Sequence, residues 1–140
     1  MSEKAKDIVN GMMQNDFFSQ WLGIEVVNVA PGTCLLKMTV RKEMLNGFGI
    51  AHGGIAYSLA DSALAFASNG YGQISLSIET SIAHFNKITE GEVILAEAME
   101  IHRSSKIAKY SVEVFSLAGE KKALFSGTVY RTQKAHELKK

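Results

Sequence analysis

The stretch 46-NGFGIAHGGIAYSLADSALAFASN-69 decides how this chain folds. It starts with a glycine-containing segment and continues, from Gly54 onward, as a run of good helix formers with apolar side chains on most of the circumference. A helix that is apolar nearly all round is typical of a protein interior. We therefore expect a buried helix here, with the other elements packed around it.

Three polar residues interrupt this apolar run: Ser58, Asp61 and Ser62. Helical geometry puts them on one narrow stripe, together with Gly54 and Ala65. A carboxylate in such surroundings can serve a structural hydrogen-bond network, point out through a gap in the fold, or take part in catalysis. The position of Asp61 by itself favours a structural role, and the residues that precede it shift the balance towards catalysis.

Length, charge and cysteine content narrow the class of protein. The 140 residues suit one domain, residues 1–140. The formal net charge of +1 leaves no basic face beyond the short tail Lys134–Lys140, which argues against nucleic acid as a partner. The single cysteine, Cys34, excludes an internal disulfide and fits a reducing compartment.

The sequence also lacks the signals of a membrane or secreted protein. No apolar run reaches the ~20 residues that cross a bilayer, and the first residues, MSEKAKDIVNG, lack the hydrophobic segment of a signal peptide. Four histidines without paired spacing and one cysteine give no metal-ligand pattern, and His84 and His102 are interpreted as residues at strand ends. We expect a cytoplasmic protein with no membrane partner and no metal site.

Periodicity predicts a helix, two strands, the buried helix and four further strands. The first helix covers Lys4–Gln20 and is amphipathic, and its stripe of methionines and aromatic residues is interpreted as core. Alternating runs predict strands at Ile24–Ala30, Thr33–Arg41, Ile74–Phe85, Val93–His102, Lys106–Leu117 and Lys122–Thr132. Short links make the sheet antiparallel and the fold α+β. An antiparallel sheet of about six strands wrapped around one long central helix, with an N-terminal cap helix, is the hotdog architecture. A ferredoxin-like fold would place a second helix between the later strands, where the sequence predicts none.

Six positions at the junction between the loop and the helix share one spacing pattern: Asn46, Gly49, His52, Gly53, Gly54 and Asp61. Leu59–Ala63 and Asn69 follow them, and Gly127–Arg131 is similar to a last strand of the same pattern. In these residues the chain closely resembles the hotdog-fold acyl-CoA thioesterases of the phenylacetate-degradation type, the PaaI-like branch. The resemblance extends over nearly the whole chain.

This resemblance implies a role for each residue. The backbone amide of Gly53 would polarise the thioester carbonyl, and Asp61 would act as nucleophile or as base on a water. Asn46 and His52 would shape the loop and help to hold the acyl group or the attacking water, and Ser77 would place a hydroxyl near the acid. The implied substrate is an acyl-CoA, with aryl-acetyl and medium-chain acyl groups as candidates, so coenzyme A is part of the substrate and no separate cofactor is needed.

The chemistry of thioester hydrolysis supports these roles independently. Negative charge develops on the carbonyl oxygen, and an amide at a helix N-terminus offers a free N–H and the positive end of the helix dipole. Gly53 and Gly54 let a substrate approach the backbone closely, although a tight turn alone would also explain the pair. For His52 the structural alternative is a loop residue that caps the junction by a side-chain hydrogen bond, and within an enzyme we expect it to orient groups rather than to transfer a proton.

Asp61 can act only when it is ionised, and hydrogen bonds from Ser58, Ser62 or Ser77 would help to keep it so. Gly53 and Asp61 are eight residues apart on one helix, which separates them by about 12 Å along its axis. They cannot flank the same carbonyl from one chain. We therefore expect a site shared between subunits of a homodimer or of a dimer of dimers, a homotetramer.

The coenzyme A end of the substrate calls for cations and hydroxyls near its phosphates. The turn at residues 103–106 offers both, although a solvated hairpin tip explains it equally well. The candidate substrate-binding residues are Gly54, Ser62, Arg103, Ser104, Ser105 and Lys106. The candidates for an aryl pocket, each equally compatible with ordinary core, are Phe17, Phe18, Trp21 and Tyr57.

Two other functions stay open at this point. A catalytically silent acyl-CoA-binding module would have the same fold. A hotdog dehydratase is a weaker alternative, because the sequence shows no pairing of a histidine with an acid in the pattern of those enzymes.

Overall fold

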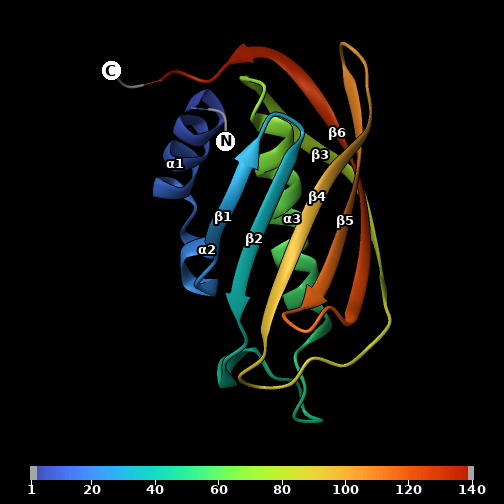
Figure 1. Cartoon of the computed structure of the whole chain (residues 1–140). Coiled ribbons are helices and arrows are strands. Elements are labelled where there is room, and N and C mark those ends of the chain that lie inside the picture. The colour runs from blue at the N-terminus through green and yellow to red at the C-terminus, as the bar shows by residue number, and fades with distance from the viewer. Residues whose placement is uncertain (1–2, 139–140) are drawn as a thin grey trace.

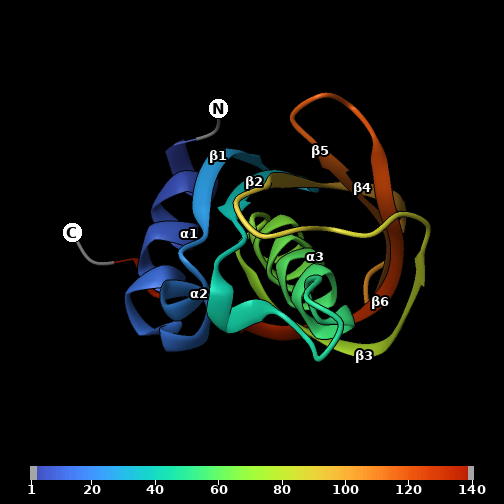
Figure 2. The ribbon, with the colours of Figure 1, turned by 90° about the horizontal axis from the view of Figure 1, so that it is seen from below.

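The apolar stretch forms helix α3, Gly53–Asn69, and a six-stranded sheet curves around it (Figure 1). The computed structural model describes residues 3–138 of the chain. Seen along the helix, the sheet encloses α3 on several sides (Figure 2). The prediction of a buried helix is confirmed, since its covered side chains include Ile55, Leu59, Ala63, Leu64 and Phe66.

The alternating runs form one antiparallel sheet. Its strands are β1 Glu25–Ala30, β2 Thr33–Thr39, β3 Gln73–His84, β4 Val93–Arg103, β5 Ile107–Ser116 and β6 Lys121–Ala135. The spatial order is β1-β2-β4-β5-β6-β3, and every neighbouring pair is antiparallel. β1 and β3 are therefore the two edges of the sheet. This is the α+β arrangement that the sequence predicts.

Most strand ends differ from the predicted boundaries by no more than two residues, and two larger differences stand out. β6 continues to Ala135 instead of ending at Thr132, because its last residues pair with the start of β3, where Gln73 lies opposite Ala135. A short 3-10 helix, η1 Lys42–Met44, follows β2 and was not expected. The basic tail Lys134–Lys140 thus begins inside β6, and its last two residues lie outside the described part of the chain.

The predicted single N-terminal helix is wrong in one respect, because two helices occupy this region. α1 spans Glu3–Asn15 and α2 spans Phe17–Leu22. Asp16 separates them by capping α2, and its carboxylate accepts a hydrogen bond from the Ser19 amide at 3.0 Å. Gly23 ends α2 with φ 75°, the left-handed conformation that glycine adopts readily at a helix end.

The break at Asp16 turns the aromatic residues of α2 outward. Phe17, Phe18 and Trp21 are 72%, 55% and 52% exposed, so the core prediction is wrong for these aromatic residues. The methionines of the stripe, Met12 and Met13, are partly buried against the core. None of the three aromatic residues lines the cavity that contains Asp61. Tyr57, the fourth aryl-pocket candidate, packs edge-on against Phe125, and the centroids of the two rings are 5.3 Å apart.

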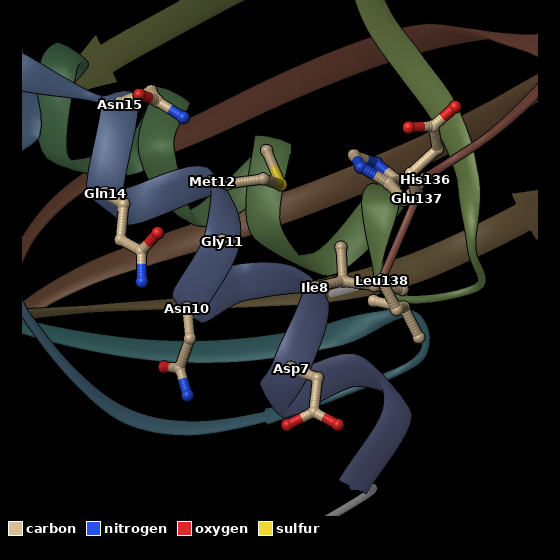
Figure 3. A pocket seen from close by; sticks show the side chains of 10 residues that line it. All are labelled: Asp7, Ile8, Asn10, Gly11, Met12, Gln14, Asn15, His136, Glu137 and Leu138. Atoms are coloured by element: carbon tan, nitrogen blue, oxygen red, sulfur yellow. The ribbon is translucent and has the colours of Figure 1, made fainter. Parts of the chain in front are cut away.

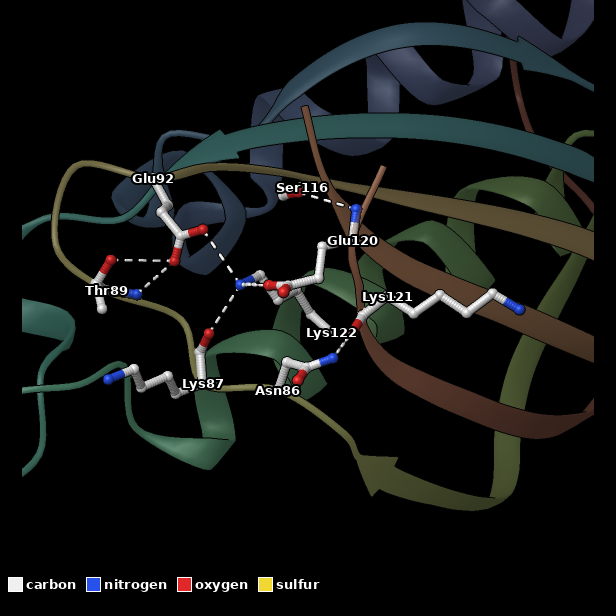
Figure 4. A network of polar contacts seen from close by, with 8 residues as sticks. All are labelled: Asn86, Lys87, Thr89, Glu92, Ser116, Glu120, Lys121 and Lys122. Carbon is white, nitrogen blue, oxygen red and sulfur yellow. Dashed lines mark hydrogen bonds and ion pairs between the residues drawn. The ribbon is translucent and has the colours of Figure 1, made fainter. Parts of the chain in front are cut away.

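A buried lysine anchors the loop between β3 and β4 to the start of β6 (Figure 4). The side chain of Lys122 is 4% exposed, and its Nζ lies 3.2 Å from Glu92 and also contacts Glu120. Nζ donates a further hydrogen bond to the Lys87 carbonyl oxygen at 2.8 Å. Burial lowers the pKa of Lys122, but hydrogen bonds to Glu120 and Glu92 outweigh it and raise the pKa overall. The loop is therefore held in one place relative to the sheet.

The composition also led to expectations about the single cysteine and about membrane-spanning segments. Cys34 is a free, buried residue of β2, where burial raises the pKa of its thiol to about 12. No helix between residues 3 and 138 is both long enough and apolar enough to span a membrane.

Candidate active site

Backbone hydrogen bonds fix the segment that leads into α3. The Ala51 amide donates to the Ile88 carbonyl at 2.7 Å, which ties this segment to the loop that Lys122 anchors. The His52 amide donates to the Met44 carbonyl at 2.8 Å. The first turn of the helix is thus presented by a rigid support.

Asn46 closes the loop before this segment. Its side-chain oxygen accepts hydrogen bonds from the amides of Phe48, at 2.9 Å, and Ile50, at 3.4 Å. The Gly49 amide donates to the Asn46 carbonyl at 3.1 Å, and Gly49 has φ 77°, which explains the need for glycine at this position. The contacts of Asn46 are those of a residue that shapes the loop.

The first turn of α3 leaves one amide hydrogen free. His52 is the N-cap, and its Nδ1 accepts a hydrogen bond from the Gly54 amide at 3.1 Å, as the capping alternative requires. The Ile55 amide donates to the His52 carbonyl at 2.9 Å. The amide of Gly53 has no acceptor within residues 3–138. It therefore combines an unused N–H with the positive end of the helix dipole.

The polar stripe of α3 is its less covered side. Ser58, Asp61, Ser62 and Ala65 are half-buried and Gly54 is exposed, whereas the other residues from 55 to 69 are buried except for the half-buried Tyr57. The helical spacing predicted this stripe correctly. Asp61 consequently lies at an opening in the layer that covers α3.

Asp61 and Ser77 line a common cavity of ≈ 280 Å³ bordered by α1, α3, β3 and β6. The structure thus brings together the acid and the hydroxyl that the resemblance places near each other. Most of the remaining walls are apolar, and they include Leu64, Ala65, Ile74, Leu76 and Val129. Such a cavity can accept an apolar group next to the carboxylate.

Two of the three serines considered as donors to Asp61 are engaged elsewhere. The Ser58 hydroxyl donates to the Gly54 carbonyl at 2.7 Å. The Ser19 hydroxyl donates to the Asp16 carboxylate at 2.7 Å, so the 2.8 Å bond between Ser19 and Ser62 uses the hydrogen of Ser62. The hydroxyl of Ser62 therefore points towards α2 and not to Asp61.

Ser77 is the one of these three serines whose hydroxyl remains free to donate a hydrogen bond to Asp61. No hydrogen bond to the Asp61 carboxylate, and none from the Ser77 hydroxyl, forms among the described residues. Burial raises the pKa of Asp61, and the negative charge of Asp16 raises it further. The result is a half-buried carboxylate whose basicity is above that of an exposed aspartate.

The free amide and the carboxylate belong to different places on the helix. Gly53 does not line the cavity of Asp61, and the eight residues between them correspond to about 12 Å of helix. A single chain thus offers one free amide and one half-buried carboxylate, but not at the same point.

Comparison with known proteins decides the family. Residues 48–123, more than half of the chain, match the family model described as the thioesterase superfamily. The chain belongs to the thioesterase superfamily. In structure this thioesterase is similar to the Escherichia coli PaaI protein from the phenylacetic acid degradation operon, with a TM-score of 0.93, 30% identity, and coverage of 96% of this chain and 97% of that chain. The predicted hotdog fold and the PaaI-like resemblance are confirmed.

Curated relatives of similar sequence include acyl-coenzyme A thioesterases. The chain is 32% identical to the E. coli acyl-coenzyme A thioesterase PaaI over 131 residues, which cover 94% of each protein. It is 27% identical to human acyl-coenzyme A thioesterase 13 over 121 residues, 84% of this chain and 86% of the human protein. A Streptococcus mutans protein solved bound to acetyl CoA shares the fold, with a TM-score of 0.78, 22% identity, and coverage of 81% of this chain and 91% of that chain.

In this thioesterase two of the four side chains in the turn at residues 103–106 already form polar contacts within the protein. Arg103 pairs with Glu100 at 2.9 Å, and the Ser104 side chain forms its hydrogen bonds within the turn. Both residues therefore stabilise the hairpin. The side chains of Ser105 and Lys106 are exposed and have no partner among the described residues.

Sequence reasoning missed one neighbour of Gly53. His84 ends β3, as expected of a residue at a strand end, but its imidazole lies beside the start of α3. A methyl group added at Gly53 would lie 3.5 Å from Nε2 of His84. No local sequence pattern predicts the contact between His84 and Gly53, because it depends on how far β3 extends along α3.

A larger cavity, of ≈ 500 Å³, lies between α1 and the segment that follows β6 (Figure 3). It contains none of the predicted site residues, and its walls are mostly polar. Met12 and His136 line this cavity and also that of Asp61. Nε2 of His136 hydrogen-bonds Asn69 at 2.7 Å, and burial lowers the pKa of His136. Within residues 3–138 no three histidine, cysteine, aspartate or glutamate side chains gather as metal ligands.

Proposed function

We propose that this thioesterase hydrolyses acyl-CoA thioesters at a site formed by Gly53 of one subunit and Asp61 of another. The observation that carries the proposal is the presence of two complementary groups on one helix. One is an amide hydrogen without an acceptor at the helix N-terminus, and the other is a half-buried carboxylate without a hydrogen-bond donor. The similarity to acyl-coenzyme A thioesterases supports the substrate class.

In the proposed reaction the carbonyl oxygen of the thioester accepts a hydrogen bond from the Gly53 amide. With Asp61 as general base, the carboxylate takes a proton from water while the water oxygen bonds to the carbonyl carbon. The C=O electron pair moves to oxygen, where the amide and the helix dipole stabilise it. When this pair returns, the C–S bond breaks, and the coenzyme A sulfur leaves with the electrons and takes up the proton.

With Asp61 as nucleophile, its carboxylate oxygen bonds to the carbonyl carbon and coenzyme A leaves as the thiolate. The resulting acid anhydride then reacts with water and releases the free acid and the Asp61 carboxylate. In either route the group must be ionised, and its raised pKa makes the carboxylate a stronger base. Ser77 lines the same cavity, and we assign its hydroxyl the role of hydrogen-bonding the carboxylate or the water.

The proposed site also has surfaces for the acyl group and for the phosphates of coenzyme A. The apolar walls beside Asp61 suit an aryl-acetyl or medium-chain acyl group. Gly54 lies where a substrate meets the helix N-terminus, while Ser105 and Lys106 are free to meet the phosphates of coenzyme A. The acetyl CoA complex of the Streptococcus mutans protein supports the capacity of this fold to hold such a ligand.

The test is the release of thiol from a panel of acyl-CoAs that compares aryl-acetyl with straight-chain acyl groups. The wild type should release coenzyme A, and Asp61→Asn, which keeps the shape of the side chain, should reduce kcat by about 1,000-fold or more. Tight binding of acyl-CoA by the wild type without turnover would instead favour a silent acyl-CoA-binding module.

A further inference from the structure

The imidazole of His84 lies next to Gly53, whose amide has the proposed role of activating the thioester. It is the last residue of β3, where it pairs with Ala123 of β6. A Cβ built on Gly53 would lie 3.5 Å from Nε2 and 3.8 Å from Cε1 of the imidazole. The ring therefore faces the first residue of α3 with its Nε2 edge.

The imidazole has hydrogen-bonding capacity that the fold does not use. Among residues 3–138 neither ring nitrogen of His84 has a hydrogen bond or an ion pair, and the side chain is exposed. His52 differs, because its Nδ1 is occupied by the Gly54 amide. Since no protein group fixes the tautomer of His84, a hydrogen can reside on Nε2 and point at an acceptor near Gly53.

Hydrogen bonds fix the backbone around His84, so the imidazole extends from a defined point at the end of β3. The Phe85 amide donates to the Lys122 carbonyl at 2.8 Å. The Asn86 side chain donates to the Lys121 carbonyl at 2.7 Å. Both contacts belong to the loop that the buried Lys122 side chain anchors (Figure 4).

We propose that His84 is a further catalytic residue, a second hydrogen-bond donor to the thioester carbonyl oxygen beside the Gly53 amide. The inference rests on the proposed thioesterase function. A carbonyl oxygen can accept two hydrogen bonds, and its demand for both grows as it becomes an oxyanion. The hydrogen stays on Nε2 throughout, so His84 forms and breaks no covalent bond. The donated hydrogen bond becomes stronger in the tetrahedral state and weakens again when the C–S bond breaks.

The test compares two substitutions at this position. His84→Phe keeps a ring and removes the donor, while His84→Gln keeps a side-chain N–H. For His84→Phe we expect kcat to fall by about 10- to 100-fold, somewhat less than the loss of a sole oxyanion-hole donor. KM and the oligomeric state should change little, and His84→Gln should recover much of kcat. Wild-type kcat in His84→Phe would overturn the proposal, as would an equal loss in both variants.

The carbonyl stretching frequency of a bound acyl-CoA provides a readout that a structural role would not move. Measured in the Asp61→Asn background, it should be lower with His84 present than in the Asp61→Asn, His84→Phe double variant, because hydrogen bonding polarises the carbonyl. Equal frequencies would contradict a direct contact. Failure of the proposed function has a different signature, since the wild type would then release no thiol from any acyl-CoA.

Discussion

At the scale of the residue, Asp61 and Asp16 form a pair of like charges that tunes the acid of the site. Burial is the first cause of the raised pKa of Asp61, and the charge of Asp16 is the second. Asp16 reaches this position because it caps α2, and the Ser19 hydroxyl, which accepts the hydrogen of Ser62, connects it to the stripe of α3. A helix cap thus doubles as an electrostatic neighbour of the carboxylate.

We expect Asp16→Asn to shift the acid limb of the kcat/KM profile to lower pH. Asparagine can still cap α2, but it carries no charge, so the Asp61 carboxylate is no longer repelled and its pKa falls. Activity rises with pH as Asp61 ionises, and a lower pKa makes this rise occur at lower pH. The measurement is the pH dependence of thiol release for the variant and the wild type. An acid limb that stays in place, or moves upward, would contradict the role of Asp16.

Substitution by proline can remove the Gly53 amide hydrogen without breaking the helix. Gly53 is the first helical residue, a position where proline is favoured, and His52 has φ −58° and ψ 142°, which suits the residue before a proline. We expect Gly53→Pro to fold normally and to lower kcat by about 100- to 1,000-fold, the effect of losing an oxyanion-hole donor.

Gly53→Ala is the matched control for this prediction. It keeps the N–H, and its methyl group would make only ordinary van der Waals contact with His84, at 3.5 Å. The methyl group also takes space near the substrate, as the proline ring does, so Gly53→Ala should lose some activity but less than Gly53→Pro, and the difference reports the amide hydrogen. Equal activities of the two variants, both with native circular dichroism, would exclude the amide as the activating group.

At the scale of the element, the apolar pattern of α3 and the alternation of the strands were sufficient to predict the main elements. The same periodicity failed at the N-terminus. Met12, Met13 and Phe17 follow helical spacing, but the local hydrogen bond between Asp16 and the Ser19 amide is compatible only with a new helix start. The signal was present in the sequence, as an aspartate three residues before a serine, and the longer apolar pattern concealed it.

The candidate site was predictable where it is local and not where it depends on packing. The cap by His52 and the loop closed by Asn46 involve neighbours in sequence. The contact between His84 and Gly53 joins residues 31 positions apart and is set by the length and curvature of β3. The hydrogen bond between Ser62 and Ser19 likewise depends on where α2 packs against α3.

The loop between β3 and β4 depends on a single buried cation. Lys122→Met keeps much of the apolar volume but leaves the Lys87 carbonyl unbonded and Glu92 without its partner. We expect the free energy of unfolding to fall by about 1–3 kcal/mol, as for other buried hydrogen bonds to charged groups. Denaturant unfolding provides the measurement.

Lys121→Met is the control for this change, because Lys121 is exposed and its side chain extends away from the network (Figure 4). Its stability should remain close to that of the wild type. If both variants were equally stable, the network around Lys122 would not fix the loop.

At the scale of the whole molecule, we propose that a second subunit covers β3. It is 12 residues long and pairs on one side only, with β6, so its other backbone edge is open. Leu76 and Ile78 on this strand are 60% and 59% exposed. A long edge strand with exposed apolar side chains is normally covered in native proteins. Ser77 lies between them and lines the Asp61 cavity, so a subunit docked at this edge would meet the site.

A shared site predicts that two inactive chains restore activity in one dimer. Asp61→Ala removes the attacking group, and Gly53→Pro removes the activating amide. In a hybrid dimer one site would lack both groups, while the other would combine the intact Gly53 of the first chain with the intact Asp61 of the second. We therefore expect the hybrid to recover about half of the activity of the wild-type dimer, since one of its two equivalent sites is complete. Two distinguishable affinity tags on co-expressed chains would isolate the hybrid for a thiol-release assay. Hybrids that form but stay as inactive as either parent would place both groups in separate functions and refute the shared site.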